Sequence, residues 1–64
     1  MWVKFSERQP DKGGEYRVMR RGLRKRPKYE DRCEWTPPIN ATHGYWINSR
    51  GVVIQTVEEW WEEQ

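Results

Sequence analysis

Side chains capable of nucleophilic or acid–base chemistry are few in this chain of 64 residues. It holds one Cys and one His, Cys33 and His43, with Pro37 and Pro38 between them. A Cys–His catalytic pair also needs an orienting group and an oxyanion site in a preformed cleft, and a zinc site needs three or four ligands. The sequence therefore predicts no catalytic residue, no metal site, no cofactor and no enzymatic activity.

The densest group of functional side chains is a basic segment. Its six cations lie close together in the chain: Arg20, Arg21, Arg24, Lys25, Arg26 and Lys28. Arg and Lys neutralise phosphates, and Arg also makes bidentate contacts with carboxylates. This segment is predicted to bind an anionic partner, either a nucleic acid or an acidic protein surface. An ordinary solvated surface is the alternative.

The formal net charge of +2 hides a separation of charge along the chain. Residues 1–32 hold eleven of the twelve Lys and Arg and five acids, a charge of +6. Residues 33–64 hold only Arg50 and five acids, a charge of −4. The two halves are therefore expected to present surfaces of opposite sign.

Two adjacent tryptophans, Trp60 and Trp61, are the second candidate contact site. Adjacent side chains of a strand point to opposite faces, so both indoles cannot enter one core. Trp is also enriched at the centres of protein interfaces. The pair is therefore predicted to contact a protein partner, the alternative being that both rings close the core from one edge.

Alternating and turn-forming residues predict one small β-rich domain over residues 1–64. An antiparallel meander of about four strands is expected, because polar and apolar residues alternate and Gly, Pro and Asn interrupt them. Asn48 to Gly51 fits a type I turn followed by a left-handed glycine. The predicted strands are 15–21, 29–35, 44–47 and 52–55, and the loops are an exposed basic loop at 22–28 and a Pro-rich loop at 36–43.

The C-terminal segment fits two structures. As a helix, Thr56 would be the N-cap, Glu59 would complete the capping box, and Val57, Trp60 and Trp61 would share a face. As a strand it would separate the two indoles. Local chemistry favours a short helix at 57–63, which would make the domain α+β.

Three further tryptophans, Trp2, Trp35 and Trp46, are assigned to the core. On strand 29–35, Asp31 shares the face of Cys33 and is expected at the sheet margin or paired with an Arg, since a buried unpaired charge is costly.

The composition also suggests a cellular location. No apolar run reaches the length that crosses a bilayer, no secretory signal precedes the first charges, and a single Cys leaves no internal disulfide. A soluble protein of the cytoplasm, without a membrane partner, is expected.

Short motifs spread over the chain resemble the phage-associated family called domain of unknown function 551. They are Trp2-Val3, then Ser6 to Pro10, then Gly13-Gly14-Glu15-Tyr16, Tyr45-Trp46 and a closing Val57-x-x-Trp60. Gln9 stands where that family has Leu, and Glu58-Glu59 where it has Thr-His. The resemblance implies a small bacteriophage or prophage accessory protein with a β-rich fold, no assigned reaction and an extended closing segment.

Together these features predict a non-enzymatic accessory protein in the cytoplasm of a bacterial host. It would bind a host protein or protein complex, inhibiting a host enzyme or a defence complex. The alternative function is a small nucleic-acid-binding regulator that uses the Arg-rich loop. The identity of the partner and the oligomeric state, with self-association as one option, are left open by the sequence.

Overall fold

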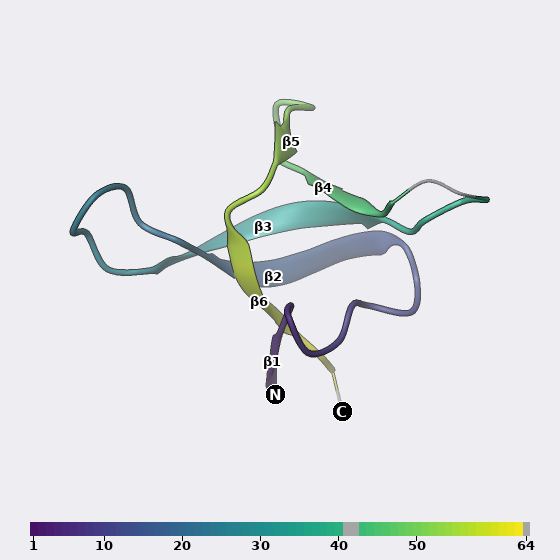
Figure 1. Cartoon of the computed structure of the whole chain (residues 1–64), viewed down its shortest axis with the longest axis horizontal. Helices are drawn as coiled ribbons and strands as arrows, with labels where there is room; N and C mark the ends of the chain where they lie inside the picture. The colour runs from purple at the N-terminus through teal and green to yellow at the C-terminus, as the bar shows by residue number, and fades with distance from the viewer. Residues whose placement is uncertain (41–42, 64) are drawn as a thin grey trace.

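A computed structural model describes residues 1–40 and 43–63 of the chain. In this part of the chain six strands form one open antiparallel sheet and no helix is present. The strands are β1 (Trp2–Lys4), β2 (Gly14–Arg20), β3 (Tyr29–Thr36), β4 (Tyr45–Ile47), β5 (Val53–Ile54) and β6 (Val57–Trp61). The predicted small β-rich domain is confirmed, with six strands instead of about four (Figure 1).

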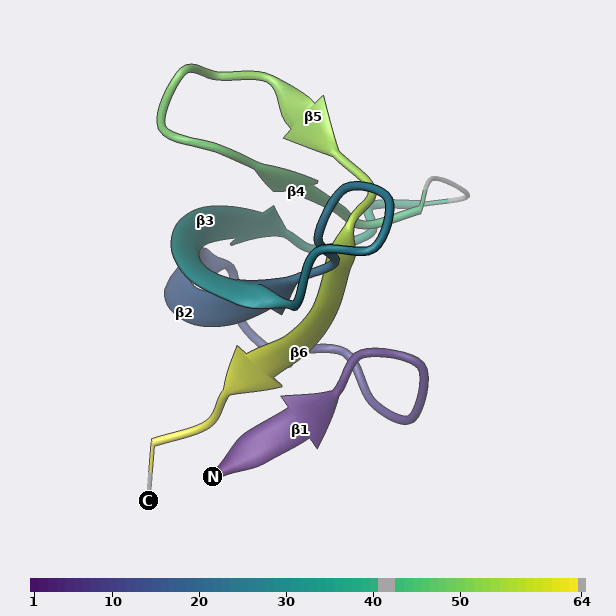
Figure 2. The same cartoon turned by 90° about the vertical axis from the view of Figure 1, so that its left-hand side faces the viewer.

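The sheet has the order β1-β6-β2-β3-β4-β5, so β6 is inserted between the N-terminal strand and the central hairpin. Only Gln55 and Thr56 connect β5 to β6, although β2, β3 and β4 lie between these strands in the sheet. A link this short spans about 10 Å at most. The sheet must therefore curl until its β5 edge approaches the start of β6, as Figure 2 shows.

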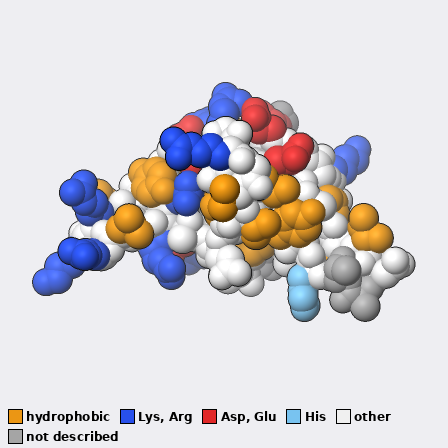
Figure 3. Space-filling model, turned by 90° about the horizontal axis from the view of Figure 1, so that it is seen from above, with side chains coloured by type: hydrophobic (Ala, Val, Ile, Leu, Met, Phe, Trp, Pro, Cys, Tyr) orange, Lys and Arg blue, Asp and Glu red, His pale blue; other side chains and the backbone are white. Residues whose placement is uncertain are grey.

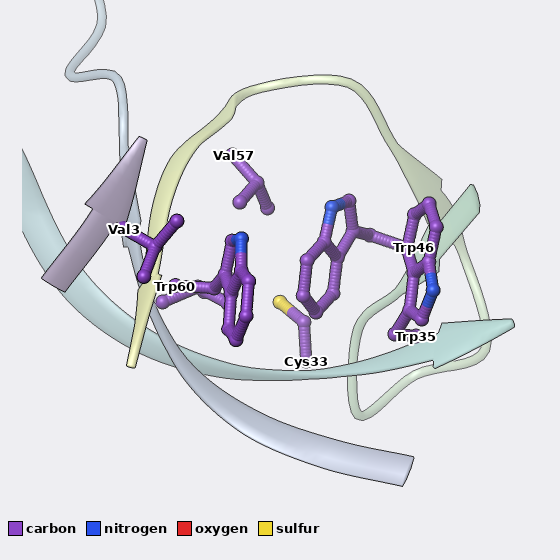
Figure 4. Close-up of a cluster of buried hydrophobic side chains, with 7 residues drawn as sticks. Val3, Cys33, Trp35, Trp46, Val57 and Trp60 are labelled. Atoms are coloured by element: carbon purple, nitrogen blue, oxygen red, sulfur yellow. The ribbon is translucent and has the colours of Figure 1, made fainter. Parts of the chain in front are cut away.

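The inside of the curl is an aromatic core. Its buried residues come from every strand except β5: Val3, Val18, Cys33, Trp35, Trp46, Val57 and Trp60 (Figure 4). The rings of Trp35 and Trp46 lie 4.9 Å apart between centroids. Phe5 contacts both rings edge-on, and Tyr16 contacts Trp46 edge-on. Rings that bury 150–250 Å² each give a short chain a core without a disulfide.

The alternation predicted for β2 and β3 is confirmed. Val18 is fully buried, and its neighbours Arg17 and Met19 lie on the outer face. On β3, Cys33 and Trp35 are buried. Asp31, expected at the margin or paired with an Arg, binds Arg20 with an O–N distance of 2.9 Å.

The predicted turn between β4 and β5 is also confirmed. Gly51 has φ 79° and donates its N–H to the carbonyl oxygen of Asn48 at 3.0 Å. The Asn48 side-chain oxygen accepts the N–H groups of Arg50 and Val52. The positive φ is the conformation that glycine adopts without steric cost.

The short C-terminal helix predicted at 57–63 is wrong, because this segment forms β6. It pairs with β1 on one side and β2 on the other. The register shifts between Met19 and Arg20, so that Glu58 is an extra residue opposite β2. This bulge places Val57 and Trp60 on the inner face although they are three positions apart, a spacing that imitates a helical face.

The assignment of Trp2 to the core is wrong as well. Val3 is the residue of β1 that points inward, and Trp2 lies on the outer face opposite Trp61. The two rings meet edge-on, with their centroids 5.3 Å apart.

Candidate binding hairpin

The connection from β2 to β3 (residues 21–28, the basic hairpin loop) extends beyond the sheet at one end of the long axis of the molecule (Figure 1). Lys and Arg side chains gather on this projecting end in the space-filling view (Figure 3). Residues 22–28, predicted as an exposed loop, lie within this connection, and Gly22 is the one buried residue among them.

The base of the hairpin is held by a contact between β2 and β3 and by contacts to the segment that precedes and forms β6. Arg20 donates from Nε to Thr56 Oγ1 at 3.0 Å and from Nη1 to Asp31 Oδ2 at 2.9 Å. The backbone N–H of Arg21 donates to the Thr56 carbonyl at 2.8 Å. Lys28 pairs with Glu59 at 2.6 Å. The basic hairpin loop therefore projects from strand ends that are held in place.

Arg20 also fixes the position of Tyr29. Its guanidinium carbon lies 5.4 Å from the centroid of the Tyr29 ring, within the range of a cation–π contact. Tyr29 remains 44% exposed. One side of the ring is thus supported by the protein while much of its surface stays open.

The end of the loop is a tight turn. Arg26 donates its N–H to the Leu23 carbonyl at 3.1 Å, and Arg24 adopts a positive φ of 57°. Gly22 packs so closely that a Cβ there would lie 2.4 Å from the carbonyl oxygens of both Arg26 and Pro27. The turn therefore requires glycine at this position.

The six basic residues predicted as a binding site fall into two groups. Arg20 and Lys28 are held in ion pairs at the base. The side chains of the other four make no hydrogen bond or ion pair with the described part of the chain: Arg21, Arg24, Lys25 and Arg26. The structure brings these four together on the loop, and sequence reasoning did not separate them from the two structural cations.

The loop also presents apolar surface that sequence reasoning did not identify. Leu23 is 77% exposed. Beside it lies a groove of about 580 Å³, lined by Gly22, Leu23, Arg26, Pro27, Lys28 and Tyr29. The signal in the sequence was an isolated Leu within a run of cations.

The two tryptophans predicted to contact a partner have different environments. Trp60 is 2% exposed and donates its Nε1–H to the Arg8 carbonyl at 2.8 Å. It belongs to the core, so its prediction as a contact residue is wrong. Trp61 lies half-buried on the outer face, where its role as a partner contact stays a prediction.

On the outer face Trp61 forms a cluster with two other residues of the chain, Trp2 and Arg17. The Arg17 guanidinium carbon lies 5.5 Å from the Trp2 ring centroid and 5.0 Å from that of Trp61. Arg17 binds both carboxylate oxygens of Glu30, at 2.8 and 3.1 Å. This hydrogen bonding lowers the pKa of Glu30 below its ordinary value.

The single Cys is placed where it has little reactivity. Cys33 is buried between the aromatic rings, and burial raises the pKa of its thiol to about 11. Reactive cysteines need an accessible thiolate.

His43 lies on the exposed loop before β4. The predicted Pro-rich loop at 36–43 overlaps the end of β3, and its residues 41–42 lie outside the described residues.

Residues 1–40 and 43–63 contain no group of three His, Cys, Asp or Glu side chains that could hold a metal ion. In the same residues, no helix is long and apolar enough to cross a membrane.

Comparison of the chain with protein families, with curated proteins and with solved structures finds no match. The resemblance to the phage-associated family stays a prediction.

Proposed function

We propose that this protein is a small non-enzymatic accessory protein that binds a protein of a bacterial host through the basic hairpin loop. The expected partner is a host enzyme or defence complex with an acidic surface, and the expected setting is the host cytoplasm during phage or prophage activity. The observation that carries the proposal is the set of four unpaired cations on a loop that projects from a fixed base.

The contrast with the rest of the molecule supports this assignment. Outside the loop, Arg8 pairs with Glu62, Arg17 with Glu30 and Arg32 with Glu15, and the exposed Lys4, Lys12 and Arg50 are far apart from one another in the chain. Exposed ion pairs of this kind contribute little to stability. Four uncompensated charges on one loop raise the local potential and increase association rates with an anionic surface.

Exposed Leu23 favours a protein over a purely ionic surface. Interfaces typically combine an apolar centre with a charged rim, and Leu23 is surrounded by Arg and Lys in the sequence. Inhibition of an enzyme by such a protein would need only that the loop occupy a functional surface of the target.

The test is affinity purification from nuclease-treated bacterial lysate with two charge-matched variants. The first carries Arg24→Gln, Lys25→Gln and Arg26→Gln in the loop. The second carries Lys4→Gln, Lys12→Gln and Arg50→Gln, three exposed cations outside the loop. A host protein retained by the wild type and the second variant, and lost with the first, supports the proposal. Equal retention by all three proteins would contradict it.

A nucleic-acid-binding regulator is the second candidate, and the same four unpaired cations favour it. If all four contact phosphates of duplex DNA, affinity should fall about 100-fold between 50 and 200 mM salt. Titration of a fluorescein-labelled duplex and of a single-stranded RNA, each about 20 nucleotides long, measures this dependence. Absence of binding at 50 mM salt would exclude this candidate.

A further inference from the structure

The groove beside Leu23 gives the proposed interaction a more specific partner. We propose that it receives the apolar side chain of an acidic peptide segment, so that the hairpin recognises one aromatic or aliphatic residue flanked by Asp and Glu. This inference rests on the proposed function, because it names the part of the partner that the basic hairpin loop binds.

The lining of the groove carries the first step. Leu23, Pro27 and Tyr29 form its apolar surface, and all three are exposed in the unbound chain. A single exposed Leu is ordinary, but here it shares one groove with an aromatic ring and a proline. Burying an apolar side chain against these three residues is therefore favourable.

The charge around the groove carries the second step. Arg26 lines it directly, and Arg24 and Lys25 are adjacent in the turn. Lys28 also lines it, although Glu59 already pairs with its ammonium group. A purely apolar occupant would leave Arg24, Lys25 and Arg26 without counter-charges. Carboxylates on both sides of an apolar residue supply these counter-charges. This complementarity selects an acidic segment.

The rigidity of the groove carries the third step. Arg20 supports the Tyr29 ring, the Arg26–Leu23 hydrogen bond closes the turn, and the backbone of Gly22 packs on the carbonyls of Arg26 and Pro27. A preformed site loses less conformational entropy on binding than a mobile loop does. The volume of about 580 Å³ lies within the range of small-ligand sites and exceeds that of one side chain, so neighbouring peptide atoms are also accommodated.

The experiment compares two fluorescein-labelled peptides of eight residues by fluorescence anisotropy. Both consist of Asp and Glu, except that one has a central Phe and the other a central Ser. The wild-type protein should bind the Phe peptide about tenfold more tightly at 50 mM salt. Leu23→Ser should reduce this ratio to about twofold or less and leave the affinity for the Ser peptide unchanged. Val52→Ser, at an exposed residue in the β4–β5 connection, is the matched control and should keep the tenfold preference.

The outcomes separate this inference from the proposed function. Equal binding of the two peptides by the wild type overturns the groove inference and leaves the acidic partner supported. Failure to bind either peptide at 50 mM salt overturns both. Tighter binding of a single-stranded oligonucleotide of equal charge, unaffected by Leu23→Ser, overturns the protein partner in favour of nucleic acid. Chemical-shift changes at Leu23 and Tyr29 with the Phe peptide, absent with the Ser peptide, support the inference without reference to affinity.

Discussion

Arg20 and Tyr29 are directly opposite each other in the last pair of the β2–β3 ladder, and the Arg20 guanidinium lies over the Tyr29 ring. The same guanidinium binds Thr56 and Asp31. One side chain thus joins β2, β3 and the start of β6 at the root of the basic hairpin loop. This contact separates Arg20 from the free cations of the loop.

Replacement of Arg20 is predicted to destabilise the protein. Arg20→Gln removes the partner of Asp31 and the support of Tyr29, and should lower the free energy of unfolding by about 1–3 kcal/mol. Urea unfolding followed by tryptophan fluorescence measures the change. Arg24→Gln removes the same charge from an exposed side chain and should change stability by less than about 0.5 kcal/mol. Equal effects of the two substitutions would contradict the structural role of Arg20.

The two adjacent tryptophans are predicted to differ in their contribution to stability. Trp60→Phe leaves a void in the core and removes the hydrogen bond to the Arg8 carbonyl, a loss of about 2 kcal/mol. Trp61→Phe keeps a ring on the half-buried outer face and should cost less than about 1 kcal/mol. Urea unfolding of both variants provides the comparison. A larger loss for Trp61→Phe would contradict the orientation of β6.

Gly22 is predicted to be essential for the shape of the loop. In Gly22→Ala the new Cβ would meet two backbone oxygens at 2.4 Å, so the turn must open. Amide chemical shifts of residues 21–29 should change, and affinity for the acidic Phe peptide should fall at least fivefold. Gly51→Ala is the control, because it strains the β4–β5 turn at φ 79° without a neighbouring atom. Amide chemical-shift changes in Gly51→Ala should remain near residues 48–53. Unchanged chemical shifts of residues 21–29 in Gly22→Ala would contradict the close packing of Gly22.

Cys33 is predicted to make the fold sensitive to alkaline pH. Burial raises its pKa from an ordinary value of 9.0 to about 11, so the folded state binds the thiol proton more tightly than the unfolded state. The buried neutral thiol therefore contributes to the free energy of unfolding. This contribution is complete below pH 9 and is lost as the pH rises from 9 to 11. The loss is about 2 kcal/mol.

Urea unfolding at pH 8, 9, 10 and 11 checks this prediction in the wild type and in Cys33→Ala. The variant is less stable at every pH because it leaves a small cavity. It retains the titration of Tyr and Lys but should lack the additional loss above pH 9. Parallel pH profiles for the two proteins would contradict the buried environment of the thiol.

Local sequence signals were sufficient where one strand face meets the core and the other meets solvent. The alternation around Val18 and around Cys33 identified the buried faces of β2 and β3, and the Asn48–Gly51 pattern identified a turn. The pairing of Asp31 with an Arg followed from the cost of a buried carboxylate. These features depend on interactions between residues that are close in the chain or opposite each other in a hairpin.

The C-terminal segment shows why local signals failed elsewhere. Thr56 and Glu59 resemble a capping box, and Val57 with Trp60 has helical spacing. The segment is nevertheless a strand, because β1 and β2 supply backbone partners on both sides. A bulge at Glu58 lets Val57 and Trp60 point to the same face of this strand. No residue near it in the chain carries this information.

The sequence by itself determined the β-rich class and the position of the basic loop, because composition and short-range pattern control these properties. Only the tertiary structure decided which tryptophan enters the core and which two of the six cations are already paired. Both outcomes depend on β6, which is inserted between β1 and β2. This insertion turns Trp60 inward, and it brings Thr56 into contact with Arg20 and Glu59 into contact with Lys28. Contacts between residues more than thirty positions apart follow from strand order, which local propensity does not specify.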